Sequence, residues 1–275
     1  MSFTTADVVK LRKVTGAGMM DCKGALAEAN GNFDRALEII REKGKLVANK
    51  RADRDAAEGV VLAKVSEDNK FGALVVLNCE TDFVAKNENF VAFADSILNV
   101  ALANNADSLE ALKAMNLDGR LIDAQVTEQT GIIGEKIELS YFGKINAETV
   151  VSYIHPGNKL ATLVGFNKEG VNSDVAKDVA MQVAAMAPVA VDKESVAQEV
   201  IDKELAIAKE KFRLEGKPEA MLDKIAQGSL NKFFKESTLL EQVYVKDGKI
   251  SIKEFLSQTD KGLTVTAFER YTLNA

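Results

Sequence analysis

Cys79, Asp82 and His155 are the residues of this sequence whose types could form a covalent catalytic site, with a thiol nucleophile, a base and an orienting acid. His155 is the only histidine of the chain, and it lies in the turn between two predicted strands. A cysteine at the end of an apolar strand is usually a small apolar side chain of the core. We therefore expect no catalytic residue in this chain.

Glycine-rich stretches and neighbouring acids are the candidates for nucleotide and metal sites in this sequence. The stretches GAGMM (16–20) and GIIGEK (131–136) lack the spacing of phosphate-binding loops. Glu80 and Asp82 offer only two carboxylates on one loop, which is few for a hard cation, and we expect them to be solvated acids of a turn. Two cysteines and one histidine do not complete a tetrahedral zinc site. We predict neither a cofactor nor a metal.

Large apolar side chains in loop-like surroundings indicate surfaces that bind a partner. Met19 and Met20 follow two glycines, and because they are adjacent on a predicted helix they cannot both point inward. We expect one of them to face solvent. Phe83 lies in the polar stretch NCETDFVAKN (78–87), directly after the apolar run FGALVVL. The pattern leaves open whether Phe83 is buried against its own helix or is an exposed wedge.

Composition limits the class of protein. A chain of 275 residues with 47% apolar residues can form one large domain or two to three smaller ones. The net charge of −6 argues against a protein that coats nucleic acid, although the first 54 residues are mildly basic. Two distant cysteines suit a reducing compartment, and no apolar run approaches the ~18 residues of a membrane span. We expect a cytoplasmic protein with no membrane segment and no direct nucleic acid partner.

The N-terminal part of the chain reads as three short helices. Their predicted ranges are about 4–15, 19–30 and 33–43, and Thr4 and Asp7 have the spacing of a capping box at the start of the first. Gly44 is expected to end the third helix. The charged, alanine-rich stretch 45–58 follows as a solvated helical linker. We therefore assign residues 1–54 to a three-helix module and its linker.

Two similar α+β units follow. Strands at 59–66 and 71–78 form a predicted hairpin, and a helix spans about 88–103. The same order of strand, turn, strand, loop and helix recurs in a hairpin of 148–155 with 159–167 and in a helix over 174–187. This repetition indicates a duplicated unit. We assign residues 55–140 to a first core subdomain and residues 141–275 to a second.

The second subdomain is predicted to contain an antiparallel helical hairpin. Apolar residues at helical spacing lie on both sides of the break Gly216-Lys217-Pro218, which places the hairpin at about 192–235. The alternating stretch GLTVTAFERY (262–271) is a last strand that closes a sheet. The fold class predicted from these elements is α+β.

Two long stretches are similar to a known family. LRKVTGAGMMDCKGALAEANGNFDRAL (11–37) and NCETDFVAKNENF (78–90) resemble the signature stretches of the bacterial translation elongation factor Ts family. SYIHPGNKLATLV (152–164) and the charged helical pair also fit, so the resemblance covers nearly the whole chain. Gly24 departs from the pattern, since the family commonly has a second lysine there. Lys159-Leu160-Ala161 replaces a frequent Arg-Ile-Gly type sequence.

The resemblance implies a fold and a function. The fold is a ubiquitin-associated-like three-helix N-terminal domain followed by two related α+β subdomains with antiparallel sheets, the second with an inserted helical hairpin. The function is that of a guanine-nucleotide exchange factor in translation elongation. It binds the GDP complex of elongation factor Tu and promotes GDP release so that GTP can bind. Such a factor acts by differential binding and is not an enzyme.

The resemblance also implies site residues. The family's exchange loop, which is thought to displace the magnesium ion of the GTPase, matches Thr81, Asp82, Phe83 and Val84. Residues that would dock the N-terminal module and the second subdomain on elongation factor Tu are Arg12, Met19, Met20 and His155. The sequence leaves open whether the chain forms a homodimer or a two-plus-two complex with elongation factor Tu. The alternatives are a hydrolase built on Cys79 and His155 and an RNA-associated adaptor that uses the basic module.

Overall fold

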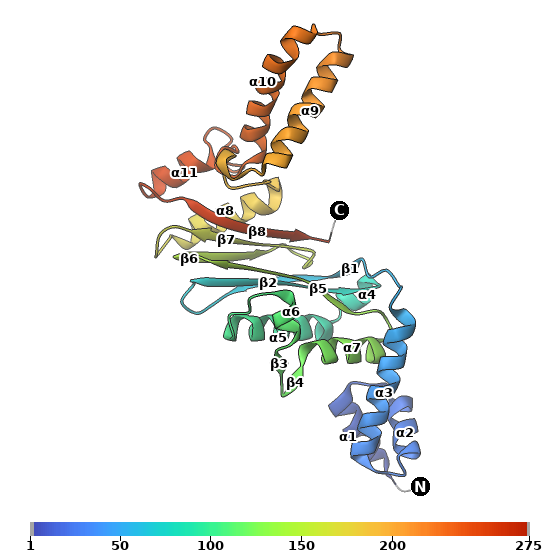
Figure 1. The fold of residues 1–275 in the computed structure, drawn as a ribbon. Coiled ribbons are helices and arrows are strands. Elements are labelled where there is room, and N and C mark those ends of the chain that lie inside the picture. The colour runs from blue at the N-terminus through green and yellow to red at the C-terminus, as the bar shows by residue number, and fades with distance from the viewer. Residues whose placement is uncertain (1–2, 274–275) are drawn as a thin grey trace.

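Three helices form the N-terminal end of the molecule (Figure 1). The computed structural model describes residues 3–273. The helices are α1 (Thr5–Thr15), α2 (Met19–Glu28) and α3 (Phe33–Arg51). The predicted capping box is present, because Asp7 N–H donates to Thr4 Oγ1 and Thr4 N–H donates to the Asp7 carboxylate. Gly16 ends α1 in the left-handed conformation, with φ of 73°.

The prediction that Gly44 ends the third helix is wrong. Helix α3 continues through Gly44 to Arg51 and thereby takes in much of the expected linker. Gly44 is buried where α3 crosses α7 (Ile122–Ile133), and a Cβ built on Gly131 would lie 2.2 Å from the Cα of Gly44. The glycine is therefore needed for close helix packing and does not act as a stop signal.

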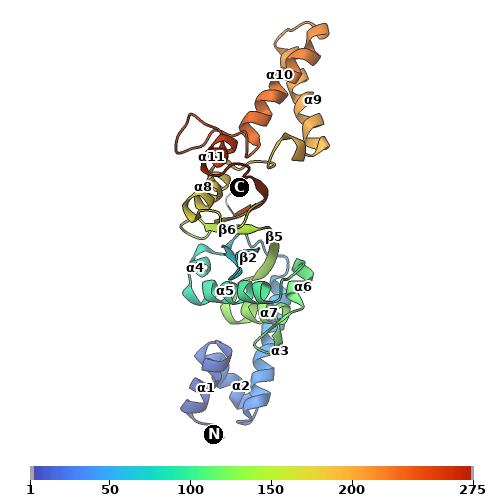
Figure 2. The same cartoon turned by 90° about the vertical axis from the view of Figure 1, so that its left-hand side faces the viewer.

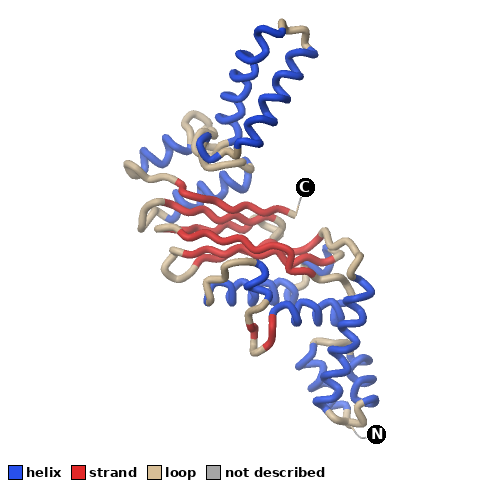
Figure 3. The backbone as a smooth tube through the Cα atoms, viewed as in Figure 1, coloured by secondary structure: helices blue, strands red, loops and turns tan. Residues whose placement is uncertain are grey.

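Two three-stranded antiparallel sheets occupy the middle of the molecule (Figure 3). The first has the order β1 (Glu58–Val65), β2 (Phe71–Cys79), β5 (Glu138–Asn146). The second has the order β6 (Thr149–Ile154), β7 (Leu160–Phe166), β8 (Val265–Thr272). Both predicted hairpins are confirmed, with Val61 opposite Val76 in one and Val151 opposite Val164 in the other. The predicted last strand closes the second sheet as β8.

The predicted boundary between residues 140 and 141 falls inside β5, which pairs with β2 along most of its length. Backbone hydrogen bonding therefore keeps the whole of β5 in the first sheet. The chain passes to the second sheet at residues 147–148, just before β6.

The two sheets pack face to face, and helices cover their outer faces (Figures 1 and 2). On the first sheet lie α4 (Asp82–Ala85), α5 (Glu88–Ala103), α6 (Leu109–Lys113), α7 and the small ribbon of β3 (Asn116–Leu117) with β4 (Arg120–Leu121). On the second sheet lie α8 (Ser173–Met186) and α11 (Ile252–Thr259), with the short turn η1 (Lys193–Ser195) near the hairpin. All residues of β2 are buried, because this strand has packed neighbours on both faces.

The predicted helical hairpin projects beyond the second sheet (Figure 1). It consists of α9 (Gln198–Leu214) and α10 (Glu219–Ser237), and Gly216 turns the chain with φ of 76°. Among residues 3–273, no helix combines the length and apolarity that a membrane crossing requires. The molecule is thus elongated, with the three-helix module at one end, the stacked sheets in the middle and the hairpin at the other end.

Candidate functional site

A sharp corner follows the central strand of the first sheet. Strand β2 ends at Cys79, and the single turn of α4 begins after Thr81, whose Oγ1 accepts a hydrogen bond from Val84 N–H at 3.4 Å. The side chain of Phe83 is 83% exposed, the largest exposed fraction of any large apolar side chain in the described residues. Of the two alternatives left open by the sequence, the exposed one holds. We call residues Thr81–Val84, which the family resemblance predicts as the exchange loop, the exchange corner.

The base of the exchange corner is held by two carboxylates. The Glu135 carboxylate accepts hydrogen bonds from Glu80 N–H at 3.1 Å, Thr81 N–H at 3.0 Å and the Thr81 hydroxyl at 2.7 Å. In the opposite direction, the Glu80 carboxylate accepts from Lys136 N–H at 2.6 Å and from Arg51 Nη1 at 2.7 Å. We call these five residues the carboxylate clasp. It joins the corner to the chain after α7 and to the last residue of α3.

Glu80 is not the solvated acid that we expected, whereas Asp82 lies at the surface. Glu80 belongs to the clasp, and Asp82 accepts a hydrogen bond from Lys86 Nζ at 2.6 Å, one helical turn away. This bond lowers the pKa of Asp82, and the nearby charge of Lys159 adds to the effect. No group of three or more His, Cys, Asp or Glu side chains suited to a metal ion occurs in residues 3–273.

The geometry gives no support to a catalytic Cys79. Its thiol is buried and donates to the carbonyl oxygen of Thr81 at 3.2 Å. Burial, together with the charge of Glu135, raises the pKa of Cys79 to about 12, so the thiol stays protonated at neutral pH. His155 is exposed, and its Nδ1 lies 2.9 Å from the Tyr153 hydroxyl. Within residues 3–273 no hydrogen bond joins Cys79, Asp82 and His155.

The turn that contains His155 lies on the same side of the sheets as the exchange corner. Asn158, in this turn, accepts a hydrogen bond from Val61 N–H of β1 at 2.7 Å. Lys159 Nζ pairs with Glu58 at 2.8 Å, and Glu58 is opposite Cys79 in the strand register. Helix α4 packs against this end of β1 (Figure 1). The structure therefore places the turn that contains His155, the one residue predicted in the second subdomain, beside the end of β1 against which α4 packs.

The predicted residues of the N-terminal module are all at its surface. Arg12 is exposed, and the side chains of Met19 and Met20 are 41% and 74% exposed. Both methionines face solvent, where we expected one, because Ala17 and Cys22 occupy the core positions of this segment. No hydrogen bond or ion pair among the described residues joins Arg12, Met19 or Met20 to the corner.

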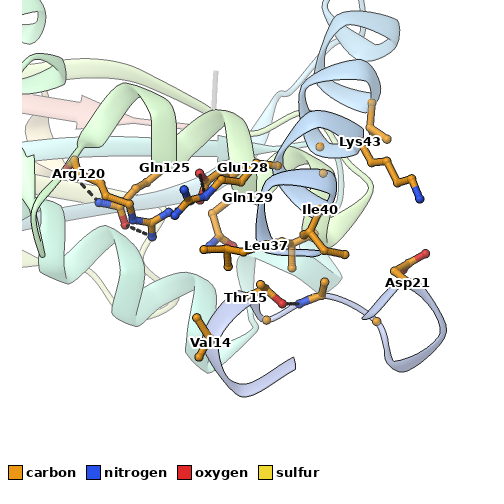
Figure 4. Close-up of a pocket in the computed structure, with 18 residues that line it drawn as sticks. Val14, Thr15, Asp21, Leu37, Ile40, Lys43, Arg120, Gln125, Glu128 and Gln129 are labelled. Atoms are coloured by element: carbon orange, nitrogen blue, oxygen red, sulfur yellow. Dashed lines mark hydrogen bonds and ion pairs between the residues drawn. The ribbon is translucent and has the colours of Figure 1, made fainter. Parts of the chain in front are cut away.

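Cavities separate the module from the first subdomain. One of about 440 Å³ is lined by Gly16 of the module and by Val84 and Phe90 beside the corner. A second, of about 590 Å³, lies between the α1–α2 loop, α3 and α7 (Figure 4). Val14, near the end of α1, is exposed and lines this second cavity. The module thus contacts the first subdomain mainly through α3, and its loop faces the corner across open space.

Two side chains of the clasp were missed by sequence reasoning. Arg51 lay in the expected linker, and Glu135 lay in GIIGEK, which was considered only as a phosphate loop. In the structure Gly134 ends α7 in the left-handed conformation, and Glu135 is the next residue. Arg51 is 29 positions and Glu135 is 55 positions from Glu80 in sequence, so no local pattern could have paired them.

Comparison with known proteins identifies relatives over the whole chain. Residues 80–275 match the family described as Elongation factor TS. The chain is 52% identical to an elongation factor Ts of Porphyromonas gingivalis, with 100% of each chain covered. It is 53% identical to that of Christiangramia forsetii, with 98% of each covered, and 41% identical to that of Bacteroides fragilis, with 100% of each covered. The chain therefore belongs to the elongation factor Ts family.

Proposed function

We propose that the exchange corner is the surface with which this chain opens the nucleotide site of its GTPase partner. As a member of the elongation factor Ts family, the chain is a guanine-nucleotide exchange factor for elongation factor Tu. It forms and breaks no covalent bond. The observation that carries the proposal is an 83% exposed phenylalanine, Phe83, on a corner whose base is fixed by side-chain hydrogen bonds.

Exchange by such a surface follows from linkage. A protein that binds the nucleotide-free GTPase more tightly than the GDP complex must weaken GDP binding by the same factor. Burial of one phenylalanine contributes about 1.5–3 kcal/mol. A thousandfold acceleration of GDP release requires about 4 kcal/mol at ~1.4 kcal/mol per decade. Phe83 alone is therefore insufficient, and other contacts must contribute.

We propose that the other contacts come from the N-terminal module and from the β6–β7 turn. Arg12, Met19 and Met20 are exposed on the N-terminal module, and His155 is exposed in the β6–β7 turn. Asp82, which is paired with Lys86 in the free chain, would act on the magnesium ion of elongation factor Tu or on its water shell. Thr81 caps α4 and Val84 lines the neighbouring cavity, so these two residues shape the corner.

We also infer that the two sheets belong to related subdomains, with a ubiquitin-associated-like domain before them. Each sheet consists of a hairpin, an intervening helical segment and a third strand that pairs with the second strand of the hairpin. The α9–α10 hairpin is inserted between α8 and β8 of the second unit. The homodimer and the two-plus-two complex with elongation factor Tu stay predictions.

Release of labelled GDP from elongation factor Tu tests the function. We expect the parent chain to accelerate release and Phe83→Ala to reduce that acceleration about ten- to hundredfold, as loss of one buried phenylalanine requires. Asp82→Asn should have a smaller effect in the same direction. Leu121→Ala is a matched control, since Leu121 is also an exposed large apolar residue but lies away from the corner.

The outcomes separate function from mechanism. No acceleration by the parent chain would contradict the exchange function. Full acceleration by both Phe83→Ala and Asp82→Asn would contradict the role of the corner and leave the exchange function standing. Phe83 is exposed, so its replacement should leave the free energy of unfolding nearly unchanged, and a loss of activity would not reflect unfolding.

A further inference from the structure

The residue that fixes the exchange corner is Glu135, which lies outside it. Glu135 is half-buried and follows Gly134, whose φ of 79° ends α7. Its Oε2 accepts hydrogen bonds from Glu80 N–H at 3.1 Å and Thr81 N–H at 3.0 Å, and its Oε1 accepts from the Thr81 hydroxyl at 2.7 Å. No ion pair in residues 3–273 includes Glu135. Three convergent donors therefore satisfy this carboxylate.

The three donors determine where β2 ends and in which direction α4 begins. Thr81 uses its hydroxyl hydrogen for Glu135, and the same oxygen accepts from Val84 N–H. Helix α4 is only four residues long, and a helix of this length has no stability of its own. The direction of Phe83, the second residue of α4, thus depends on Thr81 and through it on Glu135.

A reciprocal contact strengthens this arrangement. The Glu80 carboxylate accepts from Lys136 N–H, next to Glu135, and from Arg51 at the end of α3. The chain at 80–81 and the chain at 135–136 are therefore joined in both directions by side chain to backbone bonds. These bonds already order the corner in the free chain. Binding of the partner therefore does not have to include the loss of conformational entropy that ordering would cause.

We propose that Glu135 is a positioning residue for nucleotide exchange, which acts by holding Glu80 and Thr81 so that Phe83 points outward. The inference rests on the proposed function of the exchange corner. In this proposal Glu135 itself makes no contact with elongation factor Tu. Its loss should therefore reduce the maximal rate of GDP release and leave the affinity for elongation factor Tu, which other contacts also supply, nearly unchanged.

Saturation curves for GDP release test this proposal in the full chain. Glu135→Ala should lower the maximal rate about fivefold or more, with a half-saturating concentration within about twofold of the parent value. Glu135→Gln should recover most of the rate. Its carbonyl oxygen can accept from both backbone N–H groups, and its amide can donate to Thr81 Oγ1.

Two further variants separate positioning from a loss of stability. Glu135→Ala added to Phe83→Ala should cause no further loss, because the proposal has Glu135 act through Phe83. Asp178→Ala removes another half-buried carboxylate, which accepts from Tyr244 and Lys246 in the second subdomain. It should lower Tm without lowering the maximal rate.

Three results would contradict the positioning role of Glu135, and a fourth would contradict the proposed function instead. A parent-like maximal rate for Glu135→Ala, or additive losses in the double variant, would overturn the positioning role while Phe83→Ala still reports on the corner. An equal rate loss in Asp178→Ala at an equal loss of Tm would also overturn it. Absence of exchange by the parent chain would instead contradict the proposed function.

Discussion

Glu80 and Asp82 lie two residues apart, yet their carboxylates have different partners. The backbone N–H of Lys136 is the main cause that lowers the pKa of Glu80, and the Arg51 guanidinium adds to it. The pKa of Asp82 is lowered by Lys86, and both of these side chains are at the surface. Asp82 can separate from the Lys86 ammonium group and contact a group of the partner instead, at little cost in free energy. Glu80 cannot leave its contacts without loosening the corner.

The lowered pKa of Glu80 predicts a pH dependence of stability. A carboxyl group whose pKa is lower in the folded chain stabilises it above the ordinary value of 4.5, and this contribution is lost as pH falls through the folded-state pKa. Glu80→Gln should lower the free energy of unfolding by about 1 kcal/mol near neutral pH. The difference from the parent should shrink toward zero as the pH falls below 4.5 and through the folded-state pKa of Glu80.

Urea unfolding at several pH values measures this difference. Glu138→Gln is a suitable control, because Glu138 is a nearby exposed carboxylate paired with Lys136, and its replacement should change stability by less than about 0.5 kcal/mol. A difference between Glu80→Gln and the parent that is constant from neutral to acid pH would show that ionised Glu80 does not contribute in this way.

The sequence could predict the location of the site better than its geometry. The stretch around Phe83 and the Gly-Met loop both stand out from residue types as candidates for partner surfaces. The exposure of Phe83 could not be decided, because a phenylalanine after a strand can turn toward its own helix or away from it. Arg51 and Glu135 were out of reach, since their contacts with Glu80 join parts of the chain that are distant in sequence.

At the scale of elements, α3 connects the N-terminal module to the first subdomain. It crosses α7 at Gly44 and Gly131, where the backbones are in contact, and Arg51 at its end belongs to the clasp. Arg41 of α3 also pairs with Glu128 of α7 at 3.3 Å. These contacts fix α3, and with it the module, relative to the exchange corner. The two surfaces proposed to dock on elongation factor Tu therefore have a defined separation.

A methyl group at the helix crossing tests this connection. A Cβ at Gly131 would lie 2.2 Å from the Cα of Gly44, so α3 and α7 must move apart in Gly131→Ala. We expect a loss of about 1–3 kcal/mol in the free energy of unfolding, as for overpacking in a core. Gly24→Ala is the matched control, because nothing lies within 4 Å of its Cβ, and it should stabilise α2 by about 0.5–1 kcal/mol.

Urea unfolding of both variants provides the measurement. If Gly131→Ala were as stable as the parent, the close crossing of α3 and α7 would not contribute to stability, and the separation of the two docking surfaces would not be fixed by it. A stabilised Gly24→Ala in the same experiment would show that the method resolves effects of this size.

Local signals explain which elements could be predicted from the sequence. The capping box of Thr4 and Asp7 and both β-hairpins follow from short-range patterns, and the structure confirms them. Strand β5 has no comparable signal, since Gly143 and charged residues interrupt its alternation and its partner β2 is about 60 residues away. Gly44 misled the prediction because a glycine that permits close packing looks the same in sequence as a glycine that ends a helix.

At the scale of the whole molecule, the two sheets share a core. Alternate residues of the first sheet face the second sheet, where a Cβ at Gly72 would lie 2.7 Å from Val150 Cγ1. The buried residues between the sheets come from both, namely Val61, Ala63, Leu74, Val76, Ile145, Val150, Ala161 and Leu163. Neither sheet can expose this face to water without loss of apolar burial, so we expect the two to unfold together.

Removal of a side chain from the shared core tests this cooperativity. Leu163 is fully buried between the sheets, and Leu163→Ala should lower the free energy of unfolding by about 2–5 kcal/mol. Native-state hydrogen exchange should show an equal loss of protection for the amides of β2 in the first sheet and β7 in the second. Independent subdomains would instead lose protection in the second sheet alone.

Leu230→Ala is the control for that experiment. Leu230 is buried in the α9–α10 hairpin, outside the core between the sheets, so its loss should leave the protection of the β2 amides unchanged. The result also bears on function, because the exchange corner follows the first sheet and the His155 turn belongs to the second. If the sheets unfold as one unit, these two proposed contact regions belong to a single cooperative unit, and binding at one stabilises the part of the fold that carries the other.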